Sequence, residues 1–255
     1  MSLPPDRLSR FARHIVLPEV GGAGQVALAG AHVALVGLGG IGSPALQYLA
    51  GAGVGTLTLI VRDVGDLSNL QRQRIYREAD VGRAKADVAA RWVGQFDGAI
   101  KVRTNTGEVG GDSAAQDLEG ADLVLDGCDN FATRLIVSDT CTALGIPLTS
   151  AAIGRFQGQV ANFSGHLPGQ SCYRCFVGDA FDADDCDTCA ADGVLGAMAG
   201  MIGAFAAMQA IRVLLAGSAT LGDPQWGQLH LFEGLVPSLR TLRIAKDPEC
   251  HGCNK

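Results

Sequence analysis

A glycine-rich turn offers the first candidate chemistry in this chain. Residues 37–42 read Gly-Leu-Gly-Gly-Ile-Gly and follow the apolar run 33–36. Glycines at this spacing allow a tight turn, close approach of backbone amides to a phosphate and close packing of the next helix. Ser43-Pro44 suits the cap and first turn of that helix. Glycines in such a turn could serve only the fold, so the motif alone is weak. The candidate phosphate-binding glycines are Gly37, Gly39, Gly40 and Gly42.

Two cysteine pairs offer a metal site. Four of the eight cysteines form two Cys-x-x-Cys pairs. Each pair places two thiolates on one tight turn, and two such turns complete a tetrahedral sulfur site for Zn²⁺. A site closed by four protein ligands stabilises a fold and does not catalyse. A redox dithiol is the alternative. The predicted zinc ligands are Cys172, Cys175, Cys250 and Cys253.

Composition narrows the class of partner. The net charge is −6, and the 20 Lys and Arg residues are scattered along the chain. This distribution argues against a nucleic-acid partner or an anionic membrane surface. Residues 1–20 lack the apolar core of a signal peptide, which predicts a cytoplasmic protein. The uncharged stretch 193–211 approaches transmembrane length, but it is rich in Ala and Gly, contains Gln209 and runs into Arg212. We therefore expect a buried helix at the core or at a subunit interface.

The elements that position these groups alternate between strands and helices. This alternation predicts an α/β fold with a doubly wound, Rossmann-like, mostly parallel sheet. After about residue 159 the pattern changes, and we expect antiparallel strands to continue the same sheet. The predicted strands are 32–36, 57–61, 101–103, 123–125, 146–151, 159–163, 228–232 and 238–244, and the predicted crossover helices are 45–52 and 82–95.

With these pieces in place, the chain resembles the ubiquitin-activating-enzyme-like adenylyltransferases, specifically the short bacterial members that activate sulfur carriers for molybdopterin or thiamin-thiazole synthesis. The resemblance covers residues 10–253. Its landmarks are the glycine-rich turn, Ser-Asn-Leu-Gln-Arg-Gln at 68–73, Val81-Gly82 with Lys85, Asp-Gly-Cys-Asp-Asn at 126–130, the cysteine pairs, 188–190 and 193–196.

The resemblance implies an activity and an organisation. The C-terminal Gly-Gly carboxylate of a ubiquitin-like sulfur carrier would attack ATP and give an acyl-adenylate and pyrophosphate. We expect one adenylyltransferase domain over residues 1–255, with an N-terminal helical arm at 1–30. A nucleotide-binding half would span 31–158, and a carrier-binding and zinc-binding half would span 159–255.

The resemblance also implies roles for single residues. Arg72 and Lys85 would neutralise the triphosphate and the leaving pyrophosphate. Asp129 would bind Mg²⁺, a hard ion that prefers oxygen ligands. Arg13 would reach the nucleotide of a neighbouring subunit in a homodimer, although a merely solvent-exposed arginine is the alternative. The other implied nucleotide ligands are Asp63, Asn69, Gln73 and Asn130.

Cys189 matches a cysteine that bonds covalently to the carrier in thiazole-type members and is dispensable in molybdopterin-type members. The neighbouring acids at 184, 185 and 187 would raise the pKa of its thiol, which argues against a strongly activated thiolate. Cys186 forms a third Cys-x-x-Cys with Cys189, so a reversible disulfide or an adventitious metal is a further alternative.

One position departs from the family pattern. Val61 stands where members carry the first acid of an Asp-x-Asp that binds the ribose hydroxyls. Loss of that acceptor should cost about 1.5–3 kcal/mol, or about 10–150-fold in affinity. Arg62 is a donor and should point to the opposite face of the strand. We expect weak ATP binding, a ribose contact from another residue, or an impaired homologue that still binds the carrier.

Two further expectations concern partners and rival classes. The N-terminal sequence favours the molybdopterin-type carrier over the thiazole carrier. The chain ends two residues past Cys253, so we expect sulfur to come from a separate cysteine desulfurase or rhodanese. An NAD-dependent dehydrogenase would also need an acid near Val61, and it would leave residues 67–73 unexplained.

Overall fold

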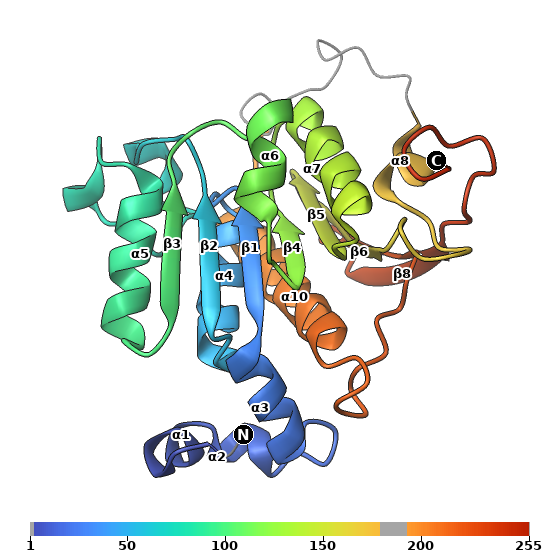
Figure 1. Cartoon of the computed structure of the whole chain (residues 1–255). Helices are drawn as coiled ribbons and strands as arrows, with labels where there is room; N and C mark the ends of the chain where they lie inside the picture. Colours follow the sequence, from blue (N-terminus) through green and yellow to red (C-terminus); the bar gives the residue numbers. More distant parts are fainter. Residues whose placement is uncertain (1–2, 179–192, 255) are drawn as a thin grey trace.

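The chain is built around one eight-stranded sheet (Figure 1). The computed structural model describes residues 3–178 and 193–254. The strands lie in the order β3-β2-β1-β4-β5-β6-β7-β8; β1 to β5 pair in parallel, and β5 to β8 pair antiparallel. The bounds are β1 His32–Val36, β2 Thr56–Ile60, β3 Lys101–Asn105, β4 Leu123–Asp126, β5 Leu148–Gly154, β6 Gln157–Phe163, β7 Gln228–Glu233 and β8 Ser238–Arg243. The mixed Rossmann-like sheet predicted from the sequence is therefore confirmed.

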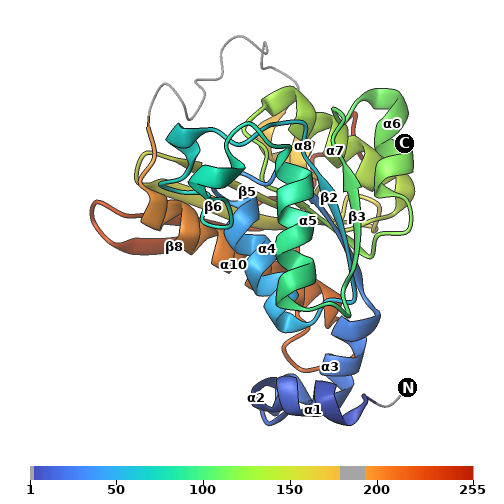
Figure 2. The same ribbon diagram turned by 90° about the vertical axis from the view of Figure 1, so that its left-hand side faces the viewer.

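Helices cover both faces of the parallel part of the sheet (Figures 1 and 2). Helices α4, α5 and α10 pack on one face, and α6 and α7 pack on the other. The bounds are α1 Pro5–Arg10, α2 Ala12–Ile15, α3 Gly21–Gly30, α4 Gly42–Ala52, α5 Lys85–Phe96, α6 Gly111–Leu118, α7 Phe131–Leu144, α8 Tyr173–Val177 and α10 Gly196–Leu214, with short 3₁₀ turns at Leu67–Asn69 and Glu78–Asp80.

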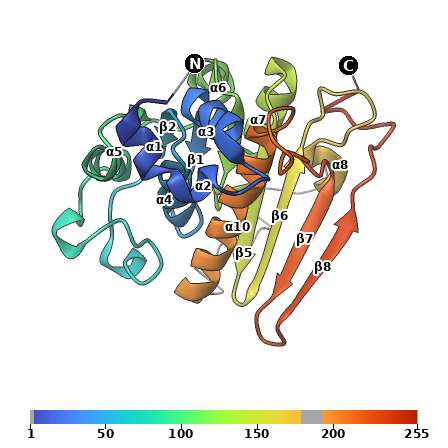
Figure 3. The ribbon, with the colours of Figure 1, turned by 90° about the horizontal axis from the view of Figure 1, so that it is seen from below.

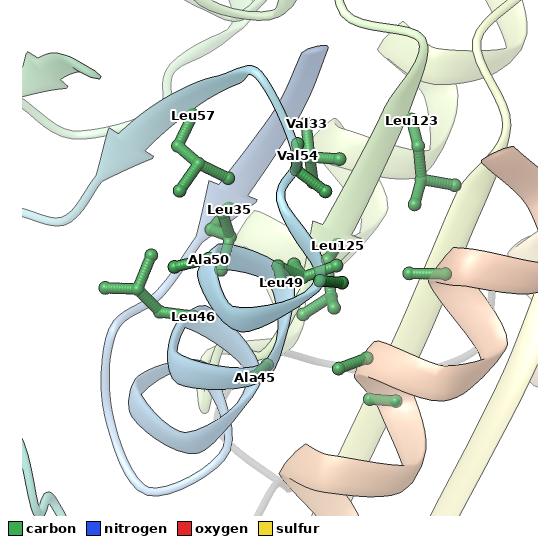
Figure 4. Packing of buried hydrophobic residues seen from close by; sticks show 14 of the residues in the cluster. Val33, Leu35, Ala45, Leu46, Leu49, Ala50, Val54, Leu57, Leu123 and Leu125 are labelled. Carbon is green, nitrogen blue, oxygen red and sulfur yellow. The ribbon is translucent and has the colours of Figure 1, made fainter. Parts of the chain in front are cut away.

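The core lies where alternate side chains of the central strands meet these helices. Every residue of β1 is buried, as expected for a strand covered on both faces. Leu35 points toward α4, where Leu46 and Leu49 pack against it (Figure 4). Ala34 and Val36 belong to the cluster on the opposite face. This packing fixes the carboxyl end of β1, from which the glycine-rich turn begins.

Helix α10 is the apolar stretch expected to be buried. By length and hydropathy it could cross a membrane, but half of its apolar window is buried inside the protein. It packs against α4, β5 and β6, and Figure 3 shows it beside these strands. Met198, Ile202 and Ala206 face the core. These contacts are those of a core helix in a folded protein.

The N-terminal helices lie at the end of the sheet where β1 begins, away from its carboxyl edge (Figure 1). Arg7 anchors them, because its Nη1 donates a 2.5 Å hydrogen bond to Oδ2 of Asp97, just beyond α5. The guanidinium of Arg10 lies 4.9 Å from the ring centre of Phe96, within range of a cation–π contact. These contacts bind the N-terminal arm to the rest of the chain through α1.

One local expectation is wrong. Helix α4 begins at Gly42, with Ile41 at the cap position and no side-chain cap. Ser43 lies inside the first turn, and its buried hydroxyl has no hydrogen-bond partner among the described residues. The glycine turn enters the helix one residue before the Ser-Pro pair, so the backbone of the turn itself begins the helix.

Candidate active site

A cavity of about 600 Å³ opens at the carboxyl ends of β1, β2 and β4. Its wall includes the glycine-rich turn after β1, residues 60–63 at the end of β2 and residues 127–131 after β4. The chain order runs outward from β1 to β3 on one side and from β4 to β5 on the other. Ligands of such sheets bind at the point where the strand order reverses, and the cavity lies at that point.

The glycine-rich turn needs glycine at its two ends. Gly37 has a φ of +84°, a backbone conformation that other residues rarely adopt. A Cβ on Gly42 would overlap the carbonyl oxygen of Gly37. Gly39 and Gly40 line the cavity between them. The turn therefore presents the backbone of Gly37, Gly39 and Gly40 to the cavity.

The segment after β2 carries three side chains that are joined by hydrogen bonds. Arg72 Nη2 donates to Asn69 Oδ1 at 3.1 Å, and Gln73 Nε2 donates to the same oxygen at 2.8 Å. All three side chains line the cavity. Because Asn69 Oδ1 already accepts two bonds, its amide nitrogen is the atom suited to a phosphate oxygen. Gln73 is buried and acts on the cavity by orienting Asn69.

Lys85 lies at the first position of α5, where a cation opposes the helix dipole. Its side chain is only 4% exposed, and its Nζ lies 3.0 Å from Oδ2 of Asp63, whose side chain is 55% exposed. Both residues line the cavity. A buried ammonium at a helix N-terminus adds positive potential to that of the backbone amides. This arrangement attracts an anion such as a polyphosphate.

The segment after β4 contributes oxygen ligands. Asp129 is exposed and lines the cavity, so its carboxylate is open to a hard cation. Asn130 caps α7, because its Oδ1 accepts from the backbone amide of Thr133 at 2.9 Å. Asn130 also lines the cavity, but its oxygen is committed to the helix.

Sequence reasoning missed Arg134, a buried cation that pairs with Asp126. Arg134 Nη1 lies 3.0 Å from Oδ2 of Asp126 and 3.1 Å from Oγ of Ser150, and its Nη2 donates to the carbonyls of Cys128 and Ala151. It joins the ends of β4 and β5 to α7. The available signal was its position one turn into a helix that follows the Asp126 strand.

Aromatic side chains form the remaining wall. Tyr173, Phe176 and Phe131 line the cavity. Tyr173 packs edge-on against Phe176 at 6.1 Å between ring centres and contacts Phe131 at 6.3 Å. No sequence motif indicated this wall, because Phe131 lies far in sequence from Tyr173 and Phe176 and the three aromatic residues match no catalytic pattern.

The four paired cysteines meet behind the aromatic wall. The Sγ atoms of Cys172, Cys175, Cys250 and Cys253 all lie within 4.8 Å of one another. Burial raises the pKa of Cys172, and it raises that of Cys253 to about 11. Buried thiolates need a cation, and a soft four-sulfur set suits Zn²⁺. Tyr173 stands between the first two cysteines, so the cluster also fixes the aromatic wall.

Not every predicted position lines the cavity in the described part of the chain. Arg13 is exposed on α2, outside the cavity of its own chain. Cys189 and Cys186 lie outside the described residues. Val61 lines the cavity as an apolar side chain. The expected orientation of Arg62 is wrong, because β2 ends at Ile60 and the strand alternation no longer applies. Arg62 lines the cavity instead.

A family model described as the ThiF family matches residues 11–252. The SAMP-activating enzyme E1 of Haloferax volcanii is 36% identical over 255 residues, which cover 100% of this chain and 92% of that protein. The sulfur carrier protein adenylyltransferase of Thermus thermophilus is 38% identical over 253 residues, covering 97% and 91%. The mouse adenylyltransferase and sulfurtransferase MOCS3 is 38% identical over 255 residues, covering 100% of this chain and 54% of that protein.

Solved structures share the fold at low identity. Escherichia coli MccB, crystallised with MccA-N7isoASN, superposes with a TM-score of 0.81 at 19% identity, covering 99% of this chain and 78% of that one. PaaA superposes with a TM-score of 0.79 at 19% identity, covering 96% and 76%. At this identity the likeness concerns the fold.

Proposed function

Because the chain belongs to the ThiF family, we propose that it is an adenylyltransferase that uses ATP to activate the C-terminal carboxylate of a sulfur-carrier protein. One observation carries the proposal: the glycine-rich turn, Arg72, Lys85 and Asp129 line a single cavity. That cavity combines bare backbone, two cations and an open carboxylate. These groups suit a nucleotide triphosphate and its metal.

The chemistry requires few groups from the protein. A carboxylate oxygen of the carrier attacks the α-phosphorus of ATP, the bond from that phosphorus to the bridging oxygen breaks, and pyrophosphate leaves with the electron pair. Lys85 and Arg72 stabilise the negative charge that develops on the leaving oxygens. Positioning and electrostatic stabilisation carry such a transfer, since no protein side chain must form a bond.

A second hollow supports the approach of a peptide tail. It has a volume of about 600 Å³ and lies along the ends of β5, β6 and β7. Ala152, Ile153 and Gln159 line both this hollow and the candidate site. An extended C-terminus without bulky side chains, such as Gly-Gly, would pass from one to the other. We propose that the carrier binds over this hollow.

The decisive experiment is exchange of labelled pyrophosphate into ATP. Exchange that depends on an added carrier with a Gly-Gly terminus would support the proposal. Carriers of the molybdopterin type and of the thiazole type are tested separately, because the sequence favours the former without determining it. Absence of exchange with every carrier, together with absence of ATP binding in a titration, would refute adenylylation.

Two metals belong to the proposal. We propose that Zn²⁺ is held by Cys172, Cys175, Cys250 and Cys253, whose geometry and softness fit it. Metal analysis of the purified protein should give one zinc per chain, and Cys250→Ser should lose it. We propose that Mg²⁺ binds through Asp129 and the phosphates of ATP. Calorimetry should show that Asp129→Asn weakens Mg²⁺-dependent ATP binding more than binding without the metal.

We also propose a homodimer in which Arg13 reaches the partner's nucleotide. Exposed apolar residues on the arm support an interface there: Leu8, Val16 and Leu17 are 46%, 70% and 46% exposed. Light scattering should give twice the chain mass. A heterodimer of one Arg13→Ala chain and one Lys85→Met chain should recover exchange at one of its two sites, because that site combines an intact Lys85 with an intact Arg13 from the partner chain. If both residues served the site of their own chain, neither site would recover.

Further proposals concern the compartment, the sulfur donor, the role of Cys189 and the possibility of an impaired enzyme. The protein would act in the cytoplasm, with sulfur supplied by a separate cysteine desulfurase or rhodanese. With a thiazole-type carrier, Cys189 would form a covalent link, and Cys189→Ser would abolish the linked species without abolishing pyrophosphate exchange. The impaired alternative rests on Val61. It predicts carrier binding without exchange until Val61→Asp restores the acceptor.

A further inference from the structure

The end of β2 lacks the acceptor that a bound ribose needs. In Rossmann-type sheets an acidic side chain near this point accepts hydrogen bonds from the ribose hydroxyls. Here Val61 lines the cavity and offers only methyl groups. The carboxylates that line the cavity in the described part of the chain are Asp63, Glu108 and Asp129. One of these must serve if a ribose is bound.

Position and pairing distinguish the three carboxylates. Asp63 is engaged by the buried Lys85 at 3.0 Å. Asp129 follows β4, which is separated from β2 by β1. Glu108 lies on the loop after β3, the strand next to β2. The amide of Val61 donates to the carbonyl of Asn105 at 3.1 Å, so the Glu108 loop begins beside the residue that lacks the acceptor.

The backbone of this loop is held by side-chain hydrogen bonds. Asn105 Oδ1 accepts from the amide of Gly107 at 2.7 Å, and its Nδ2 donates to Oδ1 of Asp117 at 2.7 Å. Ser113 Oγ lies 3.4 Å from the carbonyl of Glu108. These contacts place Glu108 on a supported turn between β3 and α6.

Arg62 holds the carboxylate of Glu108 at the mouth of the cavity. Its Nη1 lies 2.7 Å from Oε1 of Glu108, and both side chains line the cavity. The side chains are 60% and 63% exposed, so such a pair contributes little to folding. A carboxylate can accept several hydrogen bonds, and Arg62 uses one oxygen. Glu108 therefore retains the capacity to accept from two hydroxyls.

We propose that Glu108, oriented by Arg62, accepts the ribose hydroxyls of the nucleotide in place of an acid at position 61. This assignment rests on the proposed binding of ATP in the same cavity. Glu108 contacts the ligand, and Arg62 is a positioning residue. The arrangement moves the acceptor from the end of one strand to the loop after its neighbour.

The test compares ATP with 2′,3′-dideoxy-ATP, each titrated calorimetrically into the full-length protein with Mg²⁺. The unaltered protein should bind ATP about 10-fold more tightly, because hydrogen bonds to a charged acceptor are lost in the analogue. Glu108→Gln should weaken ATP about 5–10-fold and leave the analogue within about 2-fold, so that the preference collapses. Arg62→Gln should reduce the preference by a smaller factor of about 2–5.

Two further variants separate this role from a general loss of charge. Glu119→Gln removes an equal charge from the exposed residue after α6, outside the cavity, and should leave both affinities unchanged. Val61→Asp in the Glu108→Gln background should restore the preference for ATP. Rescue by an acid at 61 would not follow if Glu108 only supported the loop.

Four outcomes would overturn the assignment. ATP binding without any preference over the dideoxy analogue, or an equal loss of both ligands in Glu108→Gln, would show that Glu108 does not contact the hydroxyls, while adenylylation would survive. A preference that persists undiminished in Glu108→Gln would assign the acceptor to another residue. Failure of every variant, Val61→Asp included, to bind ATP would overturn the proposed function itself and this assignment with it.

Discussion

Two acid–base pairs flank the candidate site, and they are built in opposite ways. On the β4 side, Arg134 and Asp126 are 7% and 1% exposed. On the β2 side, Lys85 is 4% exposed while its partner Asp63 is 55% exposed. One pair is sealed inside the protein, and the other presents a buried cation next to an open carboxylate.

Hydrogen bonding sharpens the contrast. Asp126 accepts from the amide of Cys128 and from Arg134 and Ser150, and Arg134 also donates to two carbonyls. Lys85 carries three donor hydrogens, and its hydrogen bond to a side chain in the described part of the structure goes to Asp63. A saturated pair holds elements together, whereas an unsaturated pair can engage a ligand. The pair of Arg134 and Asp126 therefore stabilises the fold, and the pair of Lys85 and Asp63 is available to a ligand.

The largest expected effect breaks the sealed pair. Arg134→Met leaves Asp126 charged and buried, which should lower the free energy of unfolding by about 3–5 kcal/mol. Urea denaturation measures the loss. Arg134→Met combined with Asp126→Asn should recover part of it, because no unpaired charge remains. Arg62→Met, from the exposed pair at the same rim, should cost less than about 1 kcal/mol. An equal cost in both single variants would remove the architectural role of Arg134.

The next effect concerns the open pair. Lys85→Met should reduce carrier-dependent pyrophosphate exchange by about 10²–10³-fold, the range found when a group that stabilises developing charge is removed. The free energy of unfolding should change by less than about 1 kcal/mol, because the exposed Asp63 is screened by water. Lys101→Met provides the matched control on the exposed strand β3. Stability falling in step with activity would make Lys85 a structural residue.

The sequence predicted the open half of this comparison better than the sealed half. The glycine spacing requires a particular backbone, so a tight turn from strand to helix at Gly37 and Gly42 could be predicted from their order alone. The spacing of each Cys-x-x-Cys pair places two thiols on one tight turn, so the four-sulfur cluster could also be predicted. Lys85 and Arg72 needed the resemblance to the family, because an isolated basic residue is usually a solvated charge.

The features that sequence reasoning missed depend on long-range packing. Arg134 meets Ser150 and the carbonyl of Ala151 across β4 and β5, contacts that no local pattern encodes. Glu108 joins the cavity only because β3 lies next to β2. The start of α4 was expected two residues too late, because the glycine-rich turn already enters the helix at Gly42 and leaves Ile41, not Ser43, at the cap position.

A smaller effect should follow from removing the acid of the open pair. Asp63→Asn leaves Lys85 in place but without its charged partner, and exchange should fall by about 2–5-fold, in line with a partly exposed ion pair. The free energy of unfolding should fall by less than about 1 kcal/mol, because Lys85 borders the open cavity, where water can replace the 55% exposed carboxylate of Asp63. The same substitution in the sealed pair, Asp126→Asn, should instead cost several kcal/mol because it strands the buried Arg134. Similar stabilities for the two Asn variants would contradict the distinction between the pairs.

The smallest effect tests whether the β4 side is closed to solvent. Cys128 lines the cavity, but its Sγ faces the carbonyl of Val36 at 3.6 Å, and burial, aided by Asp126, raises the pKa of its thiol well above the usual range. The native thiol should stay protonated where an unfolded thiol, with a pKa of about 8.5, ionises. Native protein then binds more protons than unfolded protein, so this residue's contribution to stability declines as the pH rises above that value.

Iodoacetamide labelling followed by mass spectrometry should be slow at Cys128 up to pH 9 and rapid after denaturation. If the native protein were labelled as fast as the denatured chain, solvent would reach the pair of Asp126 and Arg134. The β4 side and the β2 side of the site would then differ in their residues but not in their exposure to solvent.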